Sequence, residues 1–92
     1  MYRRVTIASP VGLHARPASL LAKAAADHQG AVKLAKVVDG EAGTPVDAGS
    51  VLALMSLGAA HGDEVELTAD DEQILSELAE LLEDEHEGSP AH

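Results

Sequence analysis

The chain has 92 residues, the size of one small domain, and it contains no cysteine. Its net charge of −10 leaves too few basic residues to neutralise a row of phosphates, which excludes nucleic acid and anionic membranes as partners. Without thiols, disulfides, cysteine nucleophiles and cysteine-based metal sites are excluded too. No segment has the length of a membrane span or the apolar core of a signal peptide, so we expect a cytoplasmic protein.

The first part of the chain is predicted to form a strand, a helix and a second strand. Apolar and polar residues alternate over 3–8, which indicates a half-buried strand. Helix-forming residues fill 15–29, and Gly30 follows as a typical C′ residue. The apolar stripe of this helix is formed by Leu20, Leu21, Ala24 and Ala25. Residues 31–38 are then predicted to form the second strand.

The middle of the chain is predicted to form a hairpin followed by a short helix. Residues 39–45 contain two glycines and a proline, which favour a turn between two antiparallel strands. The third strand is short and covers 46–48. Ser50 is a favoured N-cap residue, so the short helix is predicted over 51–57.

The last elements are a fourth strand and an amphipathic helix. Residues 63–68 alternate, and Asp70 is placed to cap a final helix. The order βαββαβα predicts an α+β open-faced two-layer sandwich, in which helices cover one face of a mostly antiparallel four-stranded sheet. We expect one domain over 1–85 and a flexible acidic and polar tail over 86–92.

The segment GLHARPAS places His14 where a helix is about to begin. Ser, Thr, Asp or Asn would cap a helix better, which suggests that the imidazole is present for chemistry. The first-turn amides of Ala15 and Arg16 point toward whatever His14 carries, and Pro17 is tolerated in this turn. Arg16 adds a planar cation suited to phosphate oxygens. The same positive field favours a neutral, nucleophilic imidazole, as a reversible phosphoryl acceptor requires.

From these residues alone, a surface histidine beside a surface arginine is an equally weighted interpretation. A metal site is disfavoured because Arg16 would repel a cation. The remaining histidines show no ligand spacing; they are His28, His61, His86 and His92. A catalytic nucleophile would also need an adjacent base, which the sequence does not show.

Two segments resemble a known family. GLHARPAS is similar to the phosphorylation-site segment of HPr, the histidine-containing phosphocarrier of the phosphoenolpyruvate-dependent sugar phosphotransferase system of bacteria. GSVLALMSLGAAHGDEVEL, residues 49–67, resembles the family's regulatory-serine helix and the strand after it. The two motifs have the family's order and about its separation, and the family fold agrees with the element order above.

The resemblance implies a role for each matching residue. His14 is implied to be phosphorylated on Nδ1, with Arg16 as the active-site arginine and Pro17 completing the motif. Ser50 falls where many relatives carry a serine that an ATP-dependent kinase phosphorylates, although Gly49 stands where a lysine is frequent. The implied surface for docking partner proteins comprises Val51, Leu52, Leu54 and Met55.

The implied function is that of a phosphoryl carrier and not of an enzyme. Such a monomer, without metal or cofactor, accepts a phosphoryl group from phospho-enzyme I and passes it to enzyme IIA domains during sugar uptake. A kinase acting on Ser50 is a further implied partner. One alternative is a regulatory binding module of the same fold, but relatives of that kind lack the active histidine. Another is an acyl carrier, which is all-helical and has Asp where this chain has Gly49.

Overall fold

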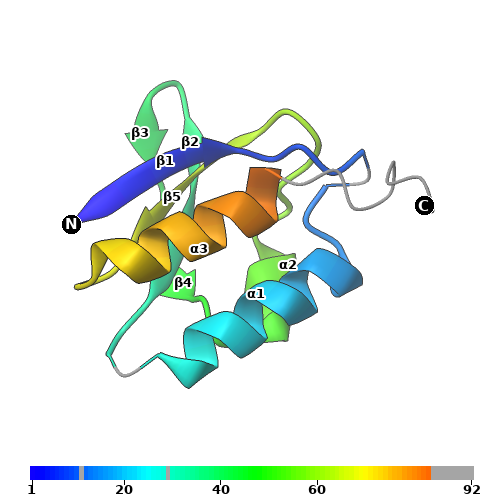
Figure 1. The fold of residues 1–92 in the computed structure, drawn as a ribbon. Helices are drawn as coiled ribbons and strands as arrows, with labels where there is room; N and C mark the ends of the chain where they lie inside the picture. The colour runs from blue at the N-terminus through cyan, green and yellow to red at the C-terminus, as the bar shows by residue number, and fades with distance from the viewer. Residues whose placement is uncertain (11, 29, 84–92) are drawn as a thin grey trace.

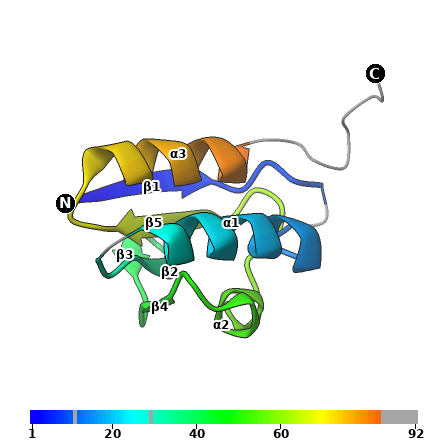
Figure 2. The same ribbon diagram turned by 60° about the horizontal axis from the view of Figure 1, so that its bottom comes forward.

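The computed structural model describes residues 1–10, 12–28 and 30–83, and within them the chain forms five strands and three helices. In chain order the elements are β1 (Tyr2–Thr6), α1 (Ala15–Asp27), β2 (Lys33–Val38), β3 (Glu41–Ala42), β4 (Val46–Asp47), α2 (Val51–Ser56), β5 (Glu64–Thr68) and α3 (Glu72–Glu83). The helices lie on one side of the sheet (Figure 1, Figure 2). The predicted α+β open-faced sandwich is therefore confirmed.

Every strand pair in the sheet is antiparallel, and the strand order is β1-β5-β2-β3, with β4 also paired to β2. The first and last strands are therefore neighbours, and their register joins Tyr2 to Thr68 and Thr6 to Glu64. Because the end of β1 lies beside the start of β5, the loop after β1 and the loop before β5 meet at one end of the sheet. This end of the sheet is where α1 begins (Figure 1).

The predicted third strand over 46–48 corresponds to β4, but an unpredicted short strand, β3, forms within the segment 39–45 that was predicted as a turn, so the sheet has five strands within the described residues and not four. Asp39 and Gly40, both at positive φ, form a two-residue hairpin turn. Further along, three residues of the returning strand, 43–45, face only two residues of β2. This extra residue forms a bulge. Pro45 lies within it and has no N–H for the ladder, which is why pairing stops there.

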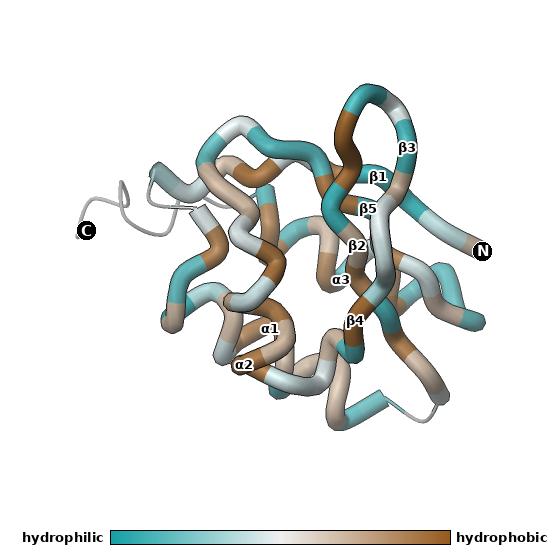
Figure 3. Tube along the Cα trace, turned by 180° about the vertical axis from the view of Figure 1, so that it is seen from behind, coloured by the Kyte–Doolittle hydropathy of each residue, from teal (hydrophilic) through white to brown (hydrophobic). Residues whose placement is uncertain are grey.

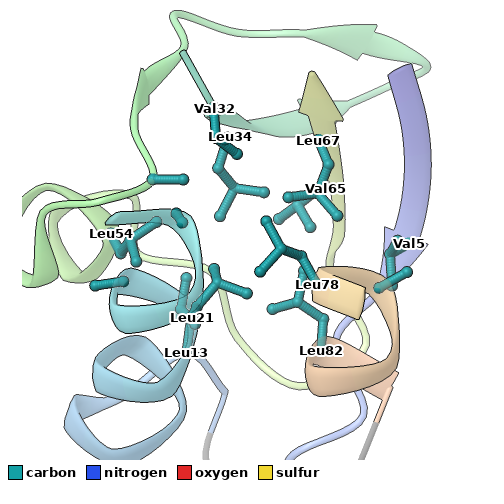
Figure 4. Packing of buried hydrophobic residues seen from close by; sticks show 14 of the residues in the cluster. Val5, Leu13, Leu21, Val32, Leu34, Leu54, Val65, Leu67, Leu78 and Leu82 are labelled. Atoms are coloured by element: carbon teal, nitrogen blue, oxygen red, sulfur yellow. The ribbon is translucent and has the colours of Figure 1, made fainter. Parts of the chain in front are cut away.

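The core lies between the sheet and the helices. Inward-facing residues of the strands meet one face of α1 and of α3 (Figure 4). Among the largest fully buried side chains are Leu21, Leu34, Val65, Leu67 and Leu78. Burial of each such side chain stabilises the fold by about 1.5–3 kcal/mol.

The predicted apolar stripe of α1 is confirmed for Leu21, Ala24 and Ala25, which are buried or packed against the core, but not for Leu20. Ala18, Leu21 and Ala22 are buried, whereas Leu20 keeps 41% of its surface exposed. Alanine carries little side-chain bulk, so this face lets α1 approach its neighbours closely. The helix ends at Asp27 with His28 as its C-cap, two residues earlier than predicted.

The start of α3 also differs by one residue from the prediction. Asp71, and not Asp70, caps the helix, because its carboxylate accepts a hydrogen bond from the Gln73 amide at 2.8 Å. Asp70 instead lies 3.0 Å from Nε2 of His28 and so connects the end of α1 to the start of α3. The hydrogen bond from His28 lowers the pKa of the Asp70 carboxyl.

Two further predictions concern the C-terminal tail and the absence of a membrane-spanning segment. The predicted tail over 86–92 lies outside the described residues. Within residues 1–10, 12–28 and 30–83, no helix has the length and apolar character needed to cross a bilayer.

Candidate functional site

His14 is the N-cap residue of α1, in the position that the sequence predicts. Its backbone is extended, with φ −99° and ψ −168°, and its side chain makes no capping hydrogen bond. The first intrahelical bond runs from the amide of Ala18 to the carbonyl of His14, over 3.0 Å. The amides of Ala15 and Arg16 therefore have no intrahelical acceptor, and Pro17 has no N–H. The positive end of the helix dipole lies beside the imidazole.

The imidazole of His14 is half-buried and is oriented by the backbone that precedes it. Its Nδ1 atom lies 3.1 Å from the carbonyl oxygen of Gly12. The backbone amide of His14 donates to the same oxygen at 3.0 Å. A carbonyl oxygen only accepts hydrogen bonds, so this contact places the ring proton on Nδ1 in the arrangement described here.

Arg16 is exposed in the first turn of α1, and Pro17 beside it is buried. Within the part of the chain that the structure describes, the guanidinium takes part in no hydrogen bond or ion pair. Its charge and its fork of N–H donors are therefore available to a ligand near His14.

The loop before β5 supports the segment that carries His14. The amide of Leu13 donates to the carbonyl of Ala59 at 3.0 Å. Gly12 has a φ of +77°, and a Cβ built on it would lie 2.7 Å from the Ala59 oxygen and 2.8 Å from Cα of Ala60. Only glycine fits this close approach. Ala59 and Ala60 were not predicted to support the site, because their side chains carry no functional group and Gly12 is the only signal of the contact in the sequence.

The residues predicted to dock partners divide into exposed and buried positions. Leu52 is 82% exposed and Met55 is 42% exposed, while Val51 is half-buried against the core. Leu54 does not belong to this surface: it is fully buried, because it is the position of the short helix α2 that points into the core. Leu20 of α1, which was not predicted, is exposed as well.

The exposed residues Leu20, Leu52 and Met55, together with half-buried Val51, are called the apolar surface below. They lie on α1 and α2, which contact one another. Both helices lie far from the turn between β2 and β3 (Figure 3). Since Leu20 is six residues after His14 on α1, the apolar surface lies on the helix that begins at the candidate site.

Ser50 is the N-cap of α2, as predicted. Its Oγ accepts a hydrogen bond from the amide of Ala53 at 3.2 Å. Just before it, the Asp47 carboxylate accepts from the amide of Gly49 at 2.9 Å. A phosphate on Ser50 would therefore lie near an acidic side chain and without the lysine that is frequent in the family.

We expect Ser50→Ala to lower the free energy of unfolding by about 0.5–2 kcal/mol, because the Ala53 amide loses its acceptor. Ser50→Asp retains a cap and so keeps the parent stability, but it adds a negative charge beside Val51 and Leu52. Urea denaturation measures the stability of both variants. A loss of stability only in Ser50→Ala is the expected result. Parent stability in Ser50→Ala would show that the Ser50 cap does not stabilise α2.

Residues 1–10, 12–28 and 30–83 contain no group of three His, Asp or Glu side chains placed to hold a metal ion.

Comparisons with known proteins identify the family of this chain. The family described as "PTS HPr component phosphorylation site" matches residues 1–84. The phosphocarrier protein HPr of Streptomyces coelicolor is 42% identical over 83 residues, which cover 87% of this chain and 85% of that protein. The HPr of Haloferax volcanii is 36% identical over 85 residues, which cover 89% of this chain and 92% of that protein.

Solved structures show the same fold. The crystal structure of HPr from Bacillus anthracis has a TM-score of 0.76 at 29% identity and covers 89% of this chain and 95% of that one. The HPr of Thermoanaerobacter tengcongensis has a TM-score of 0.75 at 31% identity, with 90% and 91% covered. The sheet also overturns the acyl-carrier alternative, which requires an all-helical fold. The chain belongs to the HPr family of phosphocarriers of the phosphotransferase system.

Proposed function

We propose that this protein accepts a phosphoryl group on His14 from phospho-enzyme I and passes it to a histidine of an enzyme IIA domain. The observation that supports this most directly is the arrangement at the start of α1. There an imidazole that does not cap the helix lies beside two helix amides without intrahelical acceptors and an arginine without a partner among the described residues. The protein is a stoichiometric carrier, and each partner supplies the other half of the transfer site.

The phosphoryl group is transferred to Nδ1, the atom that the family resemblance implies. For this, the ring proton first moves from Nδ1 to Nε2, and the hydrogen bond to the Gly12 carbonyl is lost. The lone pair of Nδ1 then forms the nitrogen–phosphorus bond while the donor's bond to phosphorus breaks. Transfer to the next protein reverses these steps, so the carrier returns to its starting state.

The positive helix end and Arg16 stabilise the charge of the transferred group. The dipole of α1 contributes about 0.3–1 kcal/mol. Each charge-assisted hydrogen bond from an amide or from the guanidinium contributes about 1.5–3 kcal/mol. Interactions of this size hold the phosphoryl group reversibly, which a relay requires.

The apolar surface is the part of the molecule that we assign to partner docking. A helix as short as α2 can bury only one face, so its apolar side chains Leu52 and Met55 are left exposed, and exposed apolar side chains grouped together are typical of protein-docking surfaces. Enzyme I and enzyme IIA domains would each cover this surface in turn, with His14 at its edge. A kinase that acts on Ser50 would change the charge of the same surface.

The proposal is tested by incubating the protein with phosphoenolpyruvate and enzyme I and measuring its intact mass. We expect a mass increase of one phosphoryl group, which is labile in acid, stable in alkali and lost when an enzyme IIA domain is added. The HPr of Streptomyces coelicolor serves as the positive control. Phosphorylation of that control without phosphorylation of this protein would overturn the proposed function.

We expect Arg16→Ala to slow phosphoryl transfer in both directions by about 10- to 100-fold, because the phosphoryl group loses a charge-assisted partner. Stability should not change, since the arginine is exposed. Stopped-flow or quench-flow transfer rates provide the measurement. Lys23→Ala removes the same charge from an exposed position of the same helix and is the matched control. Equal rates for both variants would show that Arg16 has no role in transfer.

A further inference from the structure

An ion pair outside the site described above holds the loop before β5. The Nζ atom of Lys36, on β2, lies 3.4 Å from Oδ2 of Asp63 and 3.5 Å from the carbonyl oxygen of Gly58. The same Oδ2 accepts a hydrogen bond from the amide of Ala60 at 2.9 Å. Lys36 and Asp63 therefore hold the loop at both of its ends.

Backbone hydrogen bonds attach this loop to the chain that leaves β1. The amide of Ile7 donates to the carbonyl of Asp63, and the amide of Gly62 donates to the carbonyl of Ile7, both over 2.9 Å. The amide of Asp63 also donates to the carbonyl of Ala60 at 2.9 Å. Residues 60–63 thus form a closed turn whose position relative to β1 is fixed.

The segment that carries His14 rests on the other side of this turn. The Ala60 amide that Asp63 holds directly follows the carbonyl of Ala59, which accepts from Leu13. Cα of Ala60 also lies against Gly12. A continuous chain of contacts therefore runs from Lys36 through Asp63 and the turn to the two residues before His14.

We propose that Asp63, held by Lys36, is a positioning residue that sets the place of the His14 imidazole for phosphoryl transfer. This inference rests on the proposed function. Its physical basis is that a displacement of about 1 Å at a reacting group can lower the rate by about 10²-fold. Asp63 does not touch the phosphoryl group and acts only through the turn.

The charge state of Asp63 is compatible with this role. The hydrogen bond from the Ala60 amide lowers the pKa of the Asp63 carboxyl; a smaller effect of desolvation opposes this, and Lys36 lowers the pKa further. The carboxyl is therefore ionised at neutral pH, where it both accepts from the amide and pairs with the lysine.

The experiment compares Asp63→Ala, Asp63→Asn and the control Glu66→Gln. Alanine removes the acceptor of the Ala60 amide, whereas asparagine keeps a neutral acceptor. Glu66 forms an ion pair with Arg4 at 3.2 Å, and its side chain alternates with the inward-facing Val65 and Leu67. The control therefore removes an ion pair of the sheet that has no connection to the turn.

Two measurements are made on each variant. We expect Asp63→Ala to lower kcat for phosphorylation by enzyme I about tenfold with KM unchanged, because the apolar surface is intact. Amide hydrogen exchange at Leu13 should accelerate by a similar factor relative to the core amide of Leu67. Asp63→Asn should recover most of both losses, and Glu66→Gln should match the parent.

The inference is overturned if Asp63→Ala keeps the parent kcat, or if exchange at Leu13 and Leu67 accelerates equally, as general destabilisation would produce. Its failure is distinct from failure of the proposed function. If the parent protein is not phosphorylated at all, the proposed function fails, and exchange at Leu13 alone then decides whether Asp63 positions the segment before His14.

Discussion

His14→Ala is expected to remove the phosphoenolpyruvate-dependent mass increase completely. Among the described residues near the start of α1, no other group offers a nucleophilic nitrogen, because Arg16 stays protonated and the lone pairs of the backbone amide nitrogens are delocalised into their carbonyl groups. The fold should be retained, since the His14 side chain makes no capping hydrogen bond. Intact mass after incubation with enzyme I measures the label, and circular dichroism measures the fold.

The matched control for this prediction is His61→Ala. His61 is an exposed histidine in the loop before β5, and we expect its removal to leave the full label. A label that persists in His14→Ala and disappears in His61→Ala would show that the phosphoryl acceptor is His61, in the loop before β5, and would contradict the prediction for His14. A label that persists in both variants would place the acceptor on another residue.

Gly12→Ala is expected to have the second-largest effect, because two separate penalties apply. Its φ of +77° costs a side-chain-bearing residue about 1–2 kcal/mol. In addition, the new Cβ would lie 2.7 Å from the Ala59 oxygen, so the two loops must separate. This displacement moves Leu13 and His14, and we expect phosphoryl transfer to fall by about 10²-fold.

Gly40→Ala separates these two penalties. Gly40 has a similar φ of +82°, but a Cβ built on it would meet nothing within 4 Å. This control should lose stability in urea denaturation through backbone strain alone and should transfer phosphoryl groups at the parent rate. If Gly12→Ala loses no more stability than Gly40→Ala and transfers normally, contact with the loop before β5 does not position His14.

Local signals in the chain were sufficient to predict most elements. Alternation in β1 and β5, the leucine spacing of α3 and the Ser50 cap of α2 each involve residues within a few positions of one another. The same holds for the candidate site, since the cap position of His14 and the first turn with Arg16 and Pro17 belong to one continuous segment. Such patterns depend on backbone geometry, which is the same wherever the segment lies in the fold.

The errors occurred where the orientation of an element depends on its neighbours. Leu20 was expected to be buried and Leu54 to be exposed, but the structure shows the reverse. Both helices have apolar residues on more than one face, and periodicity alone does not say which face meets the core. Alanine is equally compatible with a buried and an exposed face, so Ala18 and Ala22 were not recognised as part of the buried face of α1.

By itself, the sequence determined the order of all elements except the short strand β3, the helix start at His14 and the family to which the motifs belong. Only the tertiary structure decided what supports the histidine: Ala59 and Ala60 contact Gly12 and Leu13 across more than forty residues of chain, and Lys36 and Asp63 hold that contact from a different strand. The physical reason is that hydrogen bonds between backbone groups are independent of side-chain identity. The loop that positions the site therefore leaves almost no pattern in the sequence, and it becomes visible only when β1 and β5 are placed side by side.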